Sequence, residues 1–426
     1  MACLLFSTFL FLLLLFSASF AGEPRFVCEP ADDWNVLLDR NEGWLAGDGI
    51  FSVGLDGLSK LGSANSESKT IFLFSDSFFG KANPDGSFQG GWSMPNHCFA
   101  ILDGDQPDHA KMKFLHNTGP DGRATNLLDR KYWLGDGIVL RNPKIVNSCQ
   151  EDQRPTEAGF LNGAEAPIAN PGSGIDSQLY TTGTVVNPKD WSLEGPWMIR
   201  IPIENDKPNF AAQESKRVEL FHKDGLYEVL FGIGITDCGD SIYVYGFRDQ
   251  KGTPFFPRQL VVAQAPRSTF FDVETWKFWT GSDWSDKIAD CNRNEAALAE
   301  GMSNELSVTK MIGGPLDGKF VLVYTDLCIT ERLNFAVSSA PNKPFSKPTT
   351  FYRCPEPKLY DEAIKNFHGP QANLVTYNAK AHPRFSKPGE LLVSYNLNIF
   401  GMKEGLIFPD KKHACPRFVR LRFEYQ

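Results

Sequence analysis

The sequence predicts an all-β protein and, more specifically, a five-bladed β-propeller. Three observations lead to this prediction. Strand-like segments recur along the whole chain, helical periodicity is confined to Asn294–Glu300 and Tyr360–Phe367, and short sequence patterns are repeated. No helix alternates regularly with the strands, which argues against a parallel α/β fold.

The expected strands are short and are separated by Gly, Pro, Asp and Asn, as tight antiparallel connections require. They cover Thr70–Ser75, His97–Leu102, Ile199–Ile203, Glu228–Ile235, Ser241–Phe247, Gln259–Ala263, Lys319–Thr325, Leu333–Ser338, Glu390–Asn396 and Arg417–Phe423.

One repeated pattern places the blades relative to one another. Leu260–Pro266 is echoed by Phe335–Pro341, and each copy follows a strand-forming segment. Each copy also precedes an aromatic segment, Trp276–Trp279 in the first case and Thr349–Tyr352 in the second. The two units therefore share a layout in which an aliphatic third strand leads through a Pro turn to an aromatic outer strand.

Five such units are expected, beginning near Asp48, Asp136, Glu228, Glu305 and His382. The last contains about three strands before the chain ends, so we expect an N-terminal strand to complete it and close the ring. Trp34–Leu38 is the candidate. The Pro-, Asn- and Gly-rich segment Asn142–Ser177 fits no blade and is expected to be a long surface insertion.

The N-terminus predicts export. Leu4–Phe16 is almost entirely Leu and Phe and is followed by small residues up to Ala21, which is typical of a cleaved secretory signal peptide at residues 1–21. An uncleaved membrane anchor is the alternative, because the apolar stretch nearly reaches spanning length. The expected mature chain, residues 22–426, is one extracellular β-propeller domain that no longer contacts a membrane.

Cysteine content and net charge indicate which cross-links, metal sites and partners to expect. Removal of Cys3 with the signal peptide leaves eight of the nine cysteines, which in an oxidising compartment predicts up to four disulfides. The cysteines lack Cys-x-x-Cys spacing, which argues against a zinc site. A net charge of −8 without a basic run disfavours nucleic acid as a partner.

The second repeated pattern points to chemistry. Trp44-Leu-Ala-Gly-Asp48-Gly is echoed by Trp133-Leu-Gly-Asp136-Gly. In a propeller, the residues that open the innermost strands meet at one mouth of the central channel, so Asp48, Asp136, Glu305 and His382 are expected to face one another. Glycoside cleavage needs such convergent carboxyl groups, one to protonate the leaving oxygen and another to activate water or attack carbon.

Each candidate also has a purely structural interpretation. Gly-Asp-Gly is a common turn sequence, and Glu305 could be an exposed edge charge. Asp76 could cap a loop, and His97 and His382 could be structural hydrogen-bonding residues. Trp44 and Trp133 could belong to the core, although their position beside the Gly-Asp-Gly segments also suits a sugar-stacking platform.

Several segments resemble an extracellular family of five-bladed propellers long catalogued as a domain of unknown function and similar in fold to arabinanases, arabinofuranosidases and invertases. The resemblance is carried by Gly47-Asp48-Gly49 with Thr70–Gly80, Tyr132–Gly137, Asn304–Val308 with Tyr324-Thr325, Tyr377–Asn396 and Pro416–Leu421.

The resemblance implies roles for individual residues. It implies that Asp48 is a base or nucleophile, that Asp136 orients it or tunes its pKa, and that Glu305 is the acid. In one related branch a fifth-blade His is the acid, which makes His382 a rival to Glu305. Around the sugar, the expected substrate-binding residues are Trp44, Asp76, His97, Trp133, Arg332 and His382.

The leading hypothesis is therefore a secreted glycoside hydrolase that acts on a furanoside-containing or related polysaccharide, with no cofactor. A propeller that binds carbohydrate or protein without catalysis is the alternative, because fold does not fix function. A third interpretation is that the carboxylates hold a structural Ca²⁺ ion, which prefers six to eight oxygen ligands.

Overall fold

Strands account for most of the regular structure. The computed structural model describes residues 24–141, 177–187, 193–224, 226–250 and 258–425. With 48% strand and 13% helix, the predicted all-β class is confirmed. The expected signal peptide (1–21) and nearly all of the expected insertion (142–177) lie outside the described residues. Among the described helices, none is long and apolar enough to cross a membrane.

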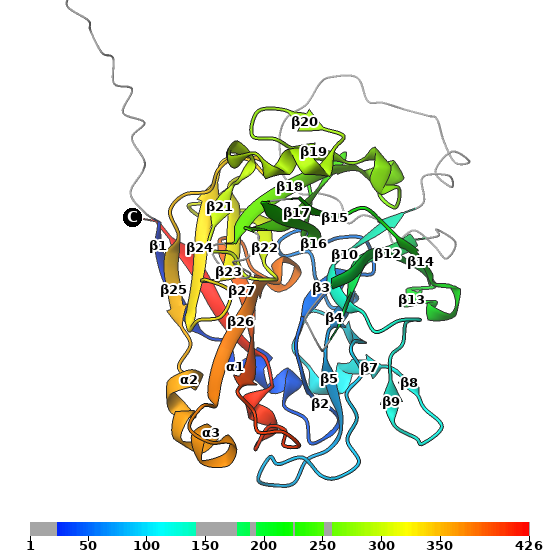
Figure 1. Cartoon of the computed structure of the whole chain (residues 1–426), viewed down its shortest axis with the longest axis vertical. Helices are drawn as coiled ribbons and strands as arrows, with labels where there is room; N and C mark the ends of the chain where they lie inside the picture. The colour runs from blue at the N-terminus through cyan, green and yellow to red at the C-terminus, as the bar shows by residue number, and fades with distance from the viewer. Residues whose placement is uncertain (1–23, 142–176, 188–192, 225, 251–257, 426) are drawn as a thin grey trace, which may run out of the picture.

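Five antiparallel sheets follow one another along the chain (Figure 1). The first, in spatial order, is β3 (Phe51–Gly54), β4 (Lys69–Phe74), β6 (Cys98–Asp103) and β7 (Met112–Leu115). The second is β10 (Trp133–Arg141), β11 (Ser177–Val186), β12 (Leu193–Glu204) and β13 (Lys207–Pro208), with β14 (Glu214–Arg217) also paired to β12.

The third sheet is the largest. Its order is β15 (Phe221–Lys223), β16 (Tyr227–Asp237), β17 (Ser241–Gln250), β18 (Gln259–Pro266), β19 (Lys277–Trp279) and β20 (Trp284–Ser285), with β21 (Ala299–Glu300) paired to β18. The fourth is β22 (Ser307–Lys310), β23 (Phe320–Thr325), β24 (Arg332–Ser338) and β25 (Thr349–Arg353). The repeated segments at Leu260–Pro266 and Phe335–Pro341 thus contribute equivalent strands, β18 and β24, as predicted.

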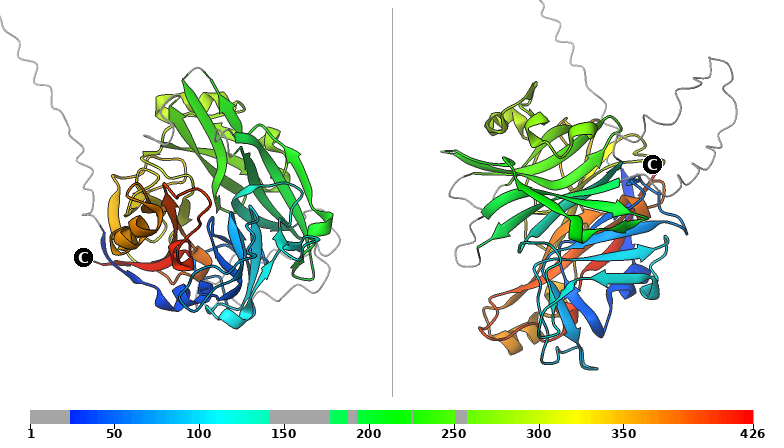
Figure 2. Two further views of the ribbon diagram at one scale, coloured as in Figure 1. Left: turned by 60° about the horizontal axis from the view of Figure 1, so that its bottom comes forward. Right: turned by 90° about the vertical axis from the view of Figure 1, so that its right-hand side faces the viewer.

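The fifth sheet joins the two ends of the described chain. It contains β26 (Asn373–Ala381), β27 (Glu390–Phe400), β28 (Arg417–Glu424) and β1 (Arg25–Pro30), which pairs with β28 from Arg25 opposite Glu424 to Pro30 opposite Val419. Figure 2 shows these terminal strands side by side. The predicted closure by an N-terminal strand is confirmed, but the strand is Arg25–Pro30.

The segment Trp34–Leu38 was the wrong choice for that strand. It lies in two short helical turns, α1 (Asp32–Asn35) and the 3₁₀ turn Val36–Leu38. Trp34, Leu37 and Leu38 are buried there, on one side of the helical turns, whereas Val36 is exposed. The apolar residues therefore cap the core beside the strand that closes the sheet, and their spacing does not follow the two-residue alternation of a strand.

The remaining elements are short. The two-stranded sheets pair β2 (Glu42–Gly47) with β5 (Ser77–Lys81) and β8 (Asn117–Thr118) with β9 (Ala124–Thr125). The other α-helices are α2 (Glu356–Leu359) and α3 (Asp361–His368). Further 3₁₀ turns lie at His109–Lys111, Phe210–Ala212, Arg267–Thr269, Val273–Thr275, Ile288–Asn292, Asn294–Ala296, Pro383–Phe385 and Lys411–His413. Of the two helices predicted from sequence, one is α3 and the other is the turn at Asn294–Ala296.

The five sheets have a propeller-like arrangement. Strands β3, β10, β16, β22 and β26 lie near the middle of the molecule (Figure 1), and each contacts the next in that order. The fifth sheet returns to the first where His382, directly after β26, hydrogen-bonds through Nδ1 to Oγ of Ser52 in β3 (2.9 Å). The inner strand of the fifth sheet thus ends just before His382, whereas the sequence placed its start near this residue.

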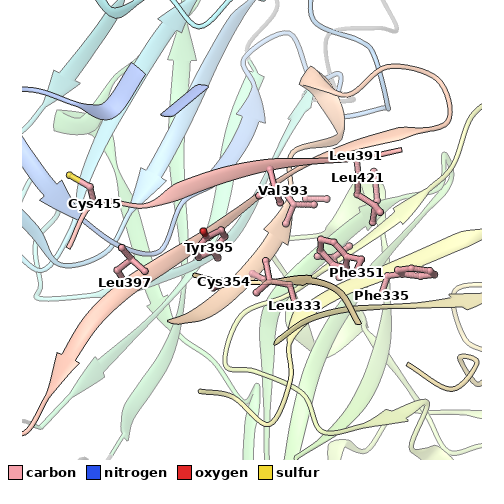
Figure 3. Close-up of a cluster of buried hydrophobic side chains, with 14 of the residues drawn as sticks. Leu333, Phe335, Phe351, Cys354, Leu391, Val393, Tyr395, Leu397, Cys415 and Leu421 are labelled. Carbon is pink, nitrogen blue, oxygen red and sulfur yellow. The ribbon is translucent and has the colours of Figure 1, made fainter. Parts of the chain in front are cut away.

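Hydrophobic side chains fill the space between successive sheets. Strand β23 is buried along its whole length, with Val321 and Val323 packed toward the fifth sheet and Leu322 and Tyr324 toward the third. This follows from strand geometry, because successive side chains point to opposite faces. Figure 3 shows the core between the fourth and fifth sheets, where Leu333 and Phe335 of β24 lie near Leu391 and Val393 of β27.

The disulfides expected from the cysteine count are not found among the described cysteines. Cys28, Cys98, Cys238, Cys291, Cys328, Cys354 and Cys415 are all free thiols, and Cys149 lies outside the described residues. Five of these thiols are buried. A buried cysteine packs as a small hydrophobic residue, so here the cysteines help to fill the sheets instead of cross-linking them.

Candidate active site

The Gly-Asp-Gly segment at residues 47–49 brings two carboxyl groups together. Asp48 lies between β2 and β3, and its backbone N–H donates to the carbonyl oxygen of Asp76 (3.1 Å), in the loop between β4 and β5. The contact leaves no room for side chains at the flanking positions, since a Cβ at Gly47 would stand 2.8 Å from that carbonyl. Gly49 also has a φ of +69°. Both glycines are therefore required by the way this loop approaches its neighbour.

The environment of Asp48 strongly disfavours its charged form. Burial, together with the charge of Asp76, raises its pKa to about 8. Tyr377 of β26 donates a hydrogen bond from its hydroxyl to Oδ2 of Asp48 (2.6 Å), which acts in the opposite direction. Asp48 therefore retains its proton at neutral pH.

Asp76 has two neutral hydrogen-bond donors. The indole Nε1 of Trp133 and the amide Nδ2 of Asn96 both donate to Oδ1 of Asp76, each at 3.2 Å. Burial raises the pKa of Asp76 to about 6, and the two hydrogen bonds limit the rise. Asp76 is therefore ionised at neutral pH while Asp48 beside it is protonated.

Asp136 is turned toward the centre by a β-bulge. The pairing of β10 with β11 shifts between Leu134 and Gly137, where two residues of β10 lie opposite one residue of β11. Asp136 is one of those two residues. Its carboxylate accepts the backbone N–H groups of Gly137 (2.8 Å) and Ile235 of β16 (2.7 Å). Burial raises its pKa to about 7, and the charge of Glu305 adds to the rise while the charge of Lys380 opposes it.

Glu305 is paired with a buried lysine. It precedes β22 and forms an ion pair with Nζ of Lys380 from β26. The Lys380 side chain is only 2% exposed, and its ammonium group lies 4.4 Å from the ring centroid of Phe51. Burial raises the pKa of Glu305, and the Lys380 ammonium acts against that rise. The charges of Glu305 and Lys380 act on both Asp48 and Asp136, so this ion pair lies between the two aspartates.

The strand β26 contributes two residues that the sequence analysis did not single out. In a regular strand, Tyr377 and Lys380 would point to opposite faces because they are three positions apart. A bulge between them, with Asn378 at a φ of +56°, brings both side chains to the site. In the sequence, this region was noted only because the segment Tyr377–Asn396 carries part of the family resemblance. The bulge that turns both side chains toward the site has no clear sequence signal.

Buried polar atoms without a hydrogen-bond partner surround this cluster. Among the described residues they include Ser75 Oγ, Asn378 Oδ1 and both amide atoms of Asn396, which lies opposite Tyr377. Buried polar groups in native proteins are nearly always hydrogen-bonded to protein or water. Their occurrence beside Asp48 and Tyr377 indicates a polar lining with unused hydrogen-bonding capacity.

A cavity of about 380 Å³ is lined by residues of the inner strands and of the loops beside them. Asp136 and Lys380 line it together with Lys60, Lys310 and Asp237, whereas Asp48, Asp76 and Glu305 are not among its lining residues. Among the described residues, no group of three or more His, Cys, Asp or Glu side chains is arranged to hold a metal ion.

Three predicted substrate-binding residues are instead buried structural residues. Trp44 is 1% exposed and stacks on Phe114 with ring centroids 4.9 Å apart. His97 is fully buried, and its Nε2 accepts the backbone N–H of Leu128 (3.0 Å). His382 is 1% exposed and is held between two serine hydroxyl groups. Their burial removes all three from contact with a substrate.

Burial also settles the protonation of the two histidines. It lowers the pKa of His97 to about 4 and that of His382 to about 3, the latter with a contribution from the charge of Lys380. Both rings are therefore neutral at neutral pH, which argues against His382 as the acid that rivals Glu305.

The other predicted binding residues differ in their placement. Asp76 and Trp133 belong to the cluster through the hydrogen bond between them. Arg332 opens β24 and forms an ion pair with Asp326, so its guanidinium is already occupied. The sequence thus brings Asp48, Asp76, Trp133, Asp136 and Glu305 to one place and leaves Arg332 outside it.

Comparisons with known proteins agree with this fold. The family described as "Domain of unknown function (DUF5005)" matches residues 198–423. The chain belongs to that family. No curated protein matches the sequence.

Solved structures with a similar arrangement have low sequence identity to this family member. A protein from Bacteroides ovatus ATCC 8483, provisionally named a hydrolase, is 15% identical with a TM-score of 0.59, over 92% of this chain and 90% of that one. Two others have lower TM-scores. They are a GH43_1 enzyme from Xanthomonas citri (11% identity, TM-score 0.37, 92% of each chain) and the α-L-arabinofuranosidase PaAbf62A from Podospora anserina in complex with cellotriose (10%, 0.31, 90% and 98%).

Proposed function

We propose that this protein is a secreted glycoside hydrolase with a five-bladed β-propeller fold, which acts on a furanoside-containing or related polysaccharide. In this proposal the five sheets are the blades and the carboxyl groups at the inner strands form the active site. Asp48, Asp136 and Glu305 would be catalytic, and Asp76 and Trp133 would contact the sugar. The cleaved signal peptide of the sequence analysis belongs to the same proposal.

The observation that carries this proposal is the gathering of buried carboxyl groups at the inner strands, where Asp48 accepts a hydrogen bond from Tyr377 and Glu305 forms an ion pair with Lys380. Glycoside hydrolysis needs one carboxylic acid and one carboxylate at the same pH. Burial raises the pKa of Asp48 to about 8, that of Asp136 to about 7 and that of Asp76 to about 6, so the carboxyl groups of this site differ in how firmly they hold a proton. Enzymes obtain their acid and base pairs by such differences of environment.

The test is release of reducing sugar from a panel of arabinans, arabinoxylans, fructans and galactans. We expect the wild type to cleave at least one of them and Asp48→Asn and Glu305→Gln to lose roughly 10²-fold or more of that rate, a typical loss for an acid–base residue. Glu274→Gln is the matched control, because Glu274 is exposed and lies in the 3₁₀ turn Val273–Thr275 between β18 and β19. Absence of product from every polysaccharide would contradict the proposal.

The ion pair between Glu305 and Lys380 favours a second candidate, a propeller that binds carbohydrate without cleaving it. A carboxylate held by a lysine is less available as an acid, while buried polar groups could still bind sugar hydroxyls. Retention of the protein on a polysaccharide column, without sugar release, would support this alternative.

A further inference from the structure

We propose that Lys380 sets the roles of the two main carboxyl groups: it holds Glu305 ionised as the general base, and Asp48 is the proton donor. This inference rests on the proposed glycosidase function. It assigns a positioning role to a residue that the sequence analysis did not identify, and it reverses the roles of Asp48 and Glu305 that the resemblance implies.

The contact between Lys380 and Glu305 carries the first half of the inference. A buried ammonium group needs a buried counter-ion, and Glu305 is the carboxylate with which Lys380 forms an ion pair among the described residues. The Phe51 ring covers the same ammonium group. In this contact the proton belongs to the amine, so Glu305 is the negative partner.

The surroundings of Asp48 carry the second half. Its closest acidic neighbour, Asp76, is held by two neutral donors, Trp133 Nε1 and Asn96 Nδ2, which stabilise the negative form of Asp76. Two adjacent buried carboxyl groups cannot both ionise easily, so the proton that they retain belongs to Asp48. The Tyr377 hydroxyl donates to Oδ2 of Asp48, which limits the rise in the Asp48 pKa but does not reverse it.

The charged and titratable groups around the pair agree with this division. Glu305 acts on Asp48, on Asp136 of β10, on Tyr377 of β26 and on the Cys328 thiol in the loop after β23. Asp48 faces Asp76, Tyr377, Glu305 and Lys380. Among these described groups Lys380 is the cation, and its direct contact is with Glu305.

The reaction then balances as follows. The oxygen of a water molecule bonds to the anomeric carbon and gives a proton to Glu305, while the glycosidic C–O bond breaks and the leaving oxygen takes the proton of Asp48. One water is consumed, and no oxidant or reductant takes part. Exchange of a proton with solvent returns Glu305 to its ionised form and Asp48 to its protonated form.

Leaving-group dependence tests the assignment. We expect Asp48→Asn to lose roughly 10²-fold or more on the polysaccharide that the wild type cleaves, yet to stay within about tenfold on 4-nitrophenyl α-L-arabinofuranoside, whose leaving group needs no proton. Glu305→Gln should lose activity on both substrates. The opposite pattern, with Glu305→Gln spared on the nitrophenyl substrate, would overturn the proposal.

The pH profile of Lys380→Met tests the role of the lysine. Loss of the ammonium raises the pKa of Glu305, so the acidic limb of the rate profile should move to higher pH, because the base must be ionised. A shift of the alkaline limb instead would make Glu305 the acid and would refute the assignment. Lys380→Arg should restore the wild-type profile. Lys319→Met, which removes an exposed lysine that does not line the cavity, should leave it unchanged.

A titration separates this inference from the proposed function. Carboxyl-¹³C NMR of Asp- and Glu-labelled wild type, with Asp48→Asn and Glu305→Gln for assignment, should show Glu305 ionising at lower pH than Asp48. The reverse order would overturn the inference, even for an active enzyme. The expected order in a protein that cleaves no sugar would uphold the charge assignment and refute only the glycosidase proposal.

Discussion

The hydroxyl of Tyr377 lies 2.6 Å from Oδ2 of Asp48, a carboxylate 329 positions earlier in the chain. This bond connects the inner strand of the last sheet to the loop that precedes the first sheet. It also joins a carboxyl group whose pKa is strongly raised by burial to a donor that favours its charged form. The hydrogen bond therefore links the closure of the fold to the protonation of the candidate site.

Replacement of Tyr377 by Phe should raise the pKa of Asp48 above about 8. The bond stabilises the ionised carboxylate, and hydrogen bonds to charged groups contribute about 1.5–3 kcal/mol, which corresponds to roughly one to two pH units. Carboxyl NMR titration measures the shift directly. Tyr425→Phe, at an exposed position, should change nothing. An unchanged or lower Asp48 pKa in Tyr377→Phe would refute this view of the bond.

The raised pKa values also predict a pH-dependent stability. Asp48 keeps its proton in the folded state up to about pH 8 but loses it near pH 4 when unfolded, so the wild type should lose stability as pH rises through that window. Asp48→Asn removes this loss. Its melting temperature should exceed that of the wild type by roughly 2–4 °C or more at pH 8 and by much less at pH 4.5.

The matched control for that experiment is Glu274→Gln, because it removes an exposed carboxylate of the same kind. It should shift the melting temperature equally at both pH values. An equal shift for Asp48→Asn at pH 4.5 and pH 8 would mean that Asp48 is not protonated in the folded protein.

Gly135→Ala should displace the bulge that carries Asp136. A Cβ at Gly135 would lie 2.2 Å from the carbonyl oxygen of Gly232 and 2.2 Å from Oγ1 of Thr182, neither of which can move without disturbing β11 or β16. We expect a loss of about 1–3 kcal/mol in unfolding free energy, typical of overpacking, together with a changed pKa of Asp136.

Gly90→Ala tests whether that loss is specific to the bulge. An added Cβ at Gly90 meets nothing within 4 Å, so this variant should unfold like the wild type. Chemical denaturation gives both free energies. If Gly135→Ala were as stable as Gly90→Ala, the close packing of β10 on β16 would be wrong.

Phe26→Ala should weaken the strand that closes the fifth sheet. The Phe26 ring lies 5.4 Å from that of Phe335 and packs on the core between the fourth and fifth sheets. Removal of a largely buried aromatic ring costs about 3 kcal/mol. Val27→Ala is the control on the same strand, since Val27 is 40% exposed and should cost less than about 0.5 kcal/mol. Equal losses in the two variants would argue against the observed strand register.

The sequence predicted the sheets well because strand alternation is a local property. Val321 to Tyr324 alternate between two cores, and such a fully apolar run can be recognised without knowing its neighbours. That Asp48, Asp136 and Glu305 form one catalytic site stays a prediction, although each lies at an inner strand, before β3, within β10 and before β22. Closure by an N-terminal strand followed from the missing strand of the last unit.

The errors at the site come from shifts of a single residue. Trp44 precedes Asp48 by four positions, whereas Trp133 precedes Asp136 by three. One extra residue in a strand turns a side chain to the other face, and so Trp44 is buried on Phe114 while Trp133 donates to Asp76. The bulge at Asn378 has the same effect on Tyr377 and Lys380 and could not be read from residue spacing.

The pairing of β1 with β28 has a consequence for how the protein is made. Arg25 in β1 emerges from the ribosome before the first four sheets, but its partner Glu424 in β28 is made only after them. Four sheets can form while synthesis continues, yet the fifth must wait for a contact between segments far apart in the sequence. Contacts of such long separation form slowly, so the unpaired edge of the fifth sheet is exposed to aggregation until β28 has been made.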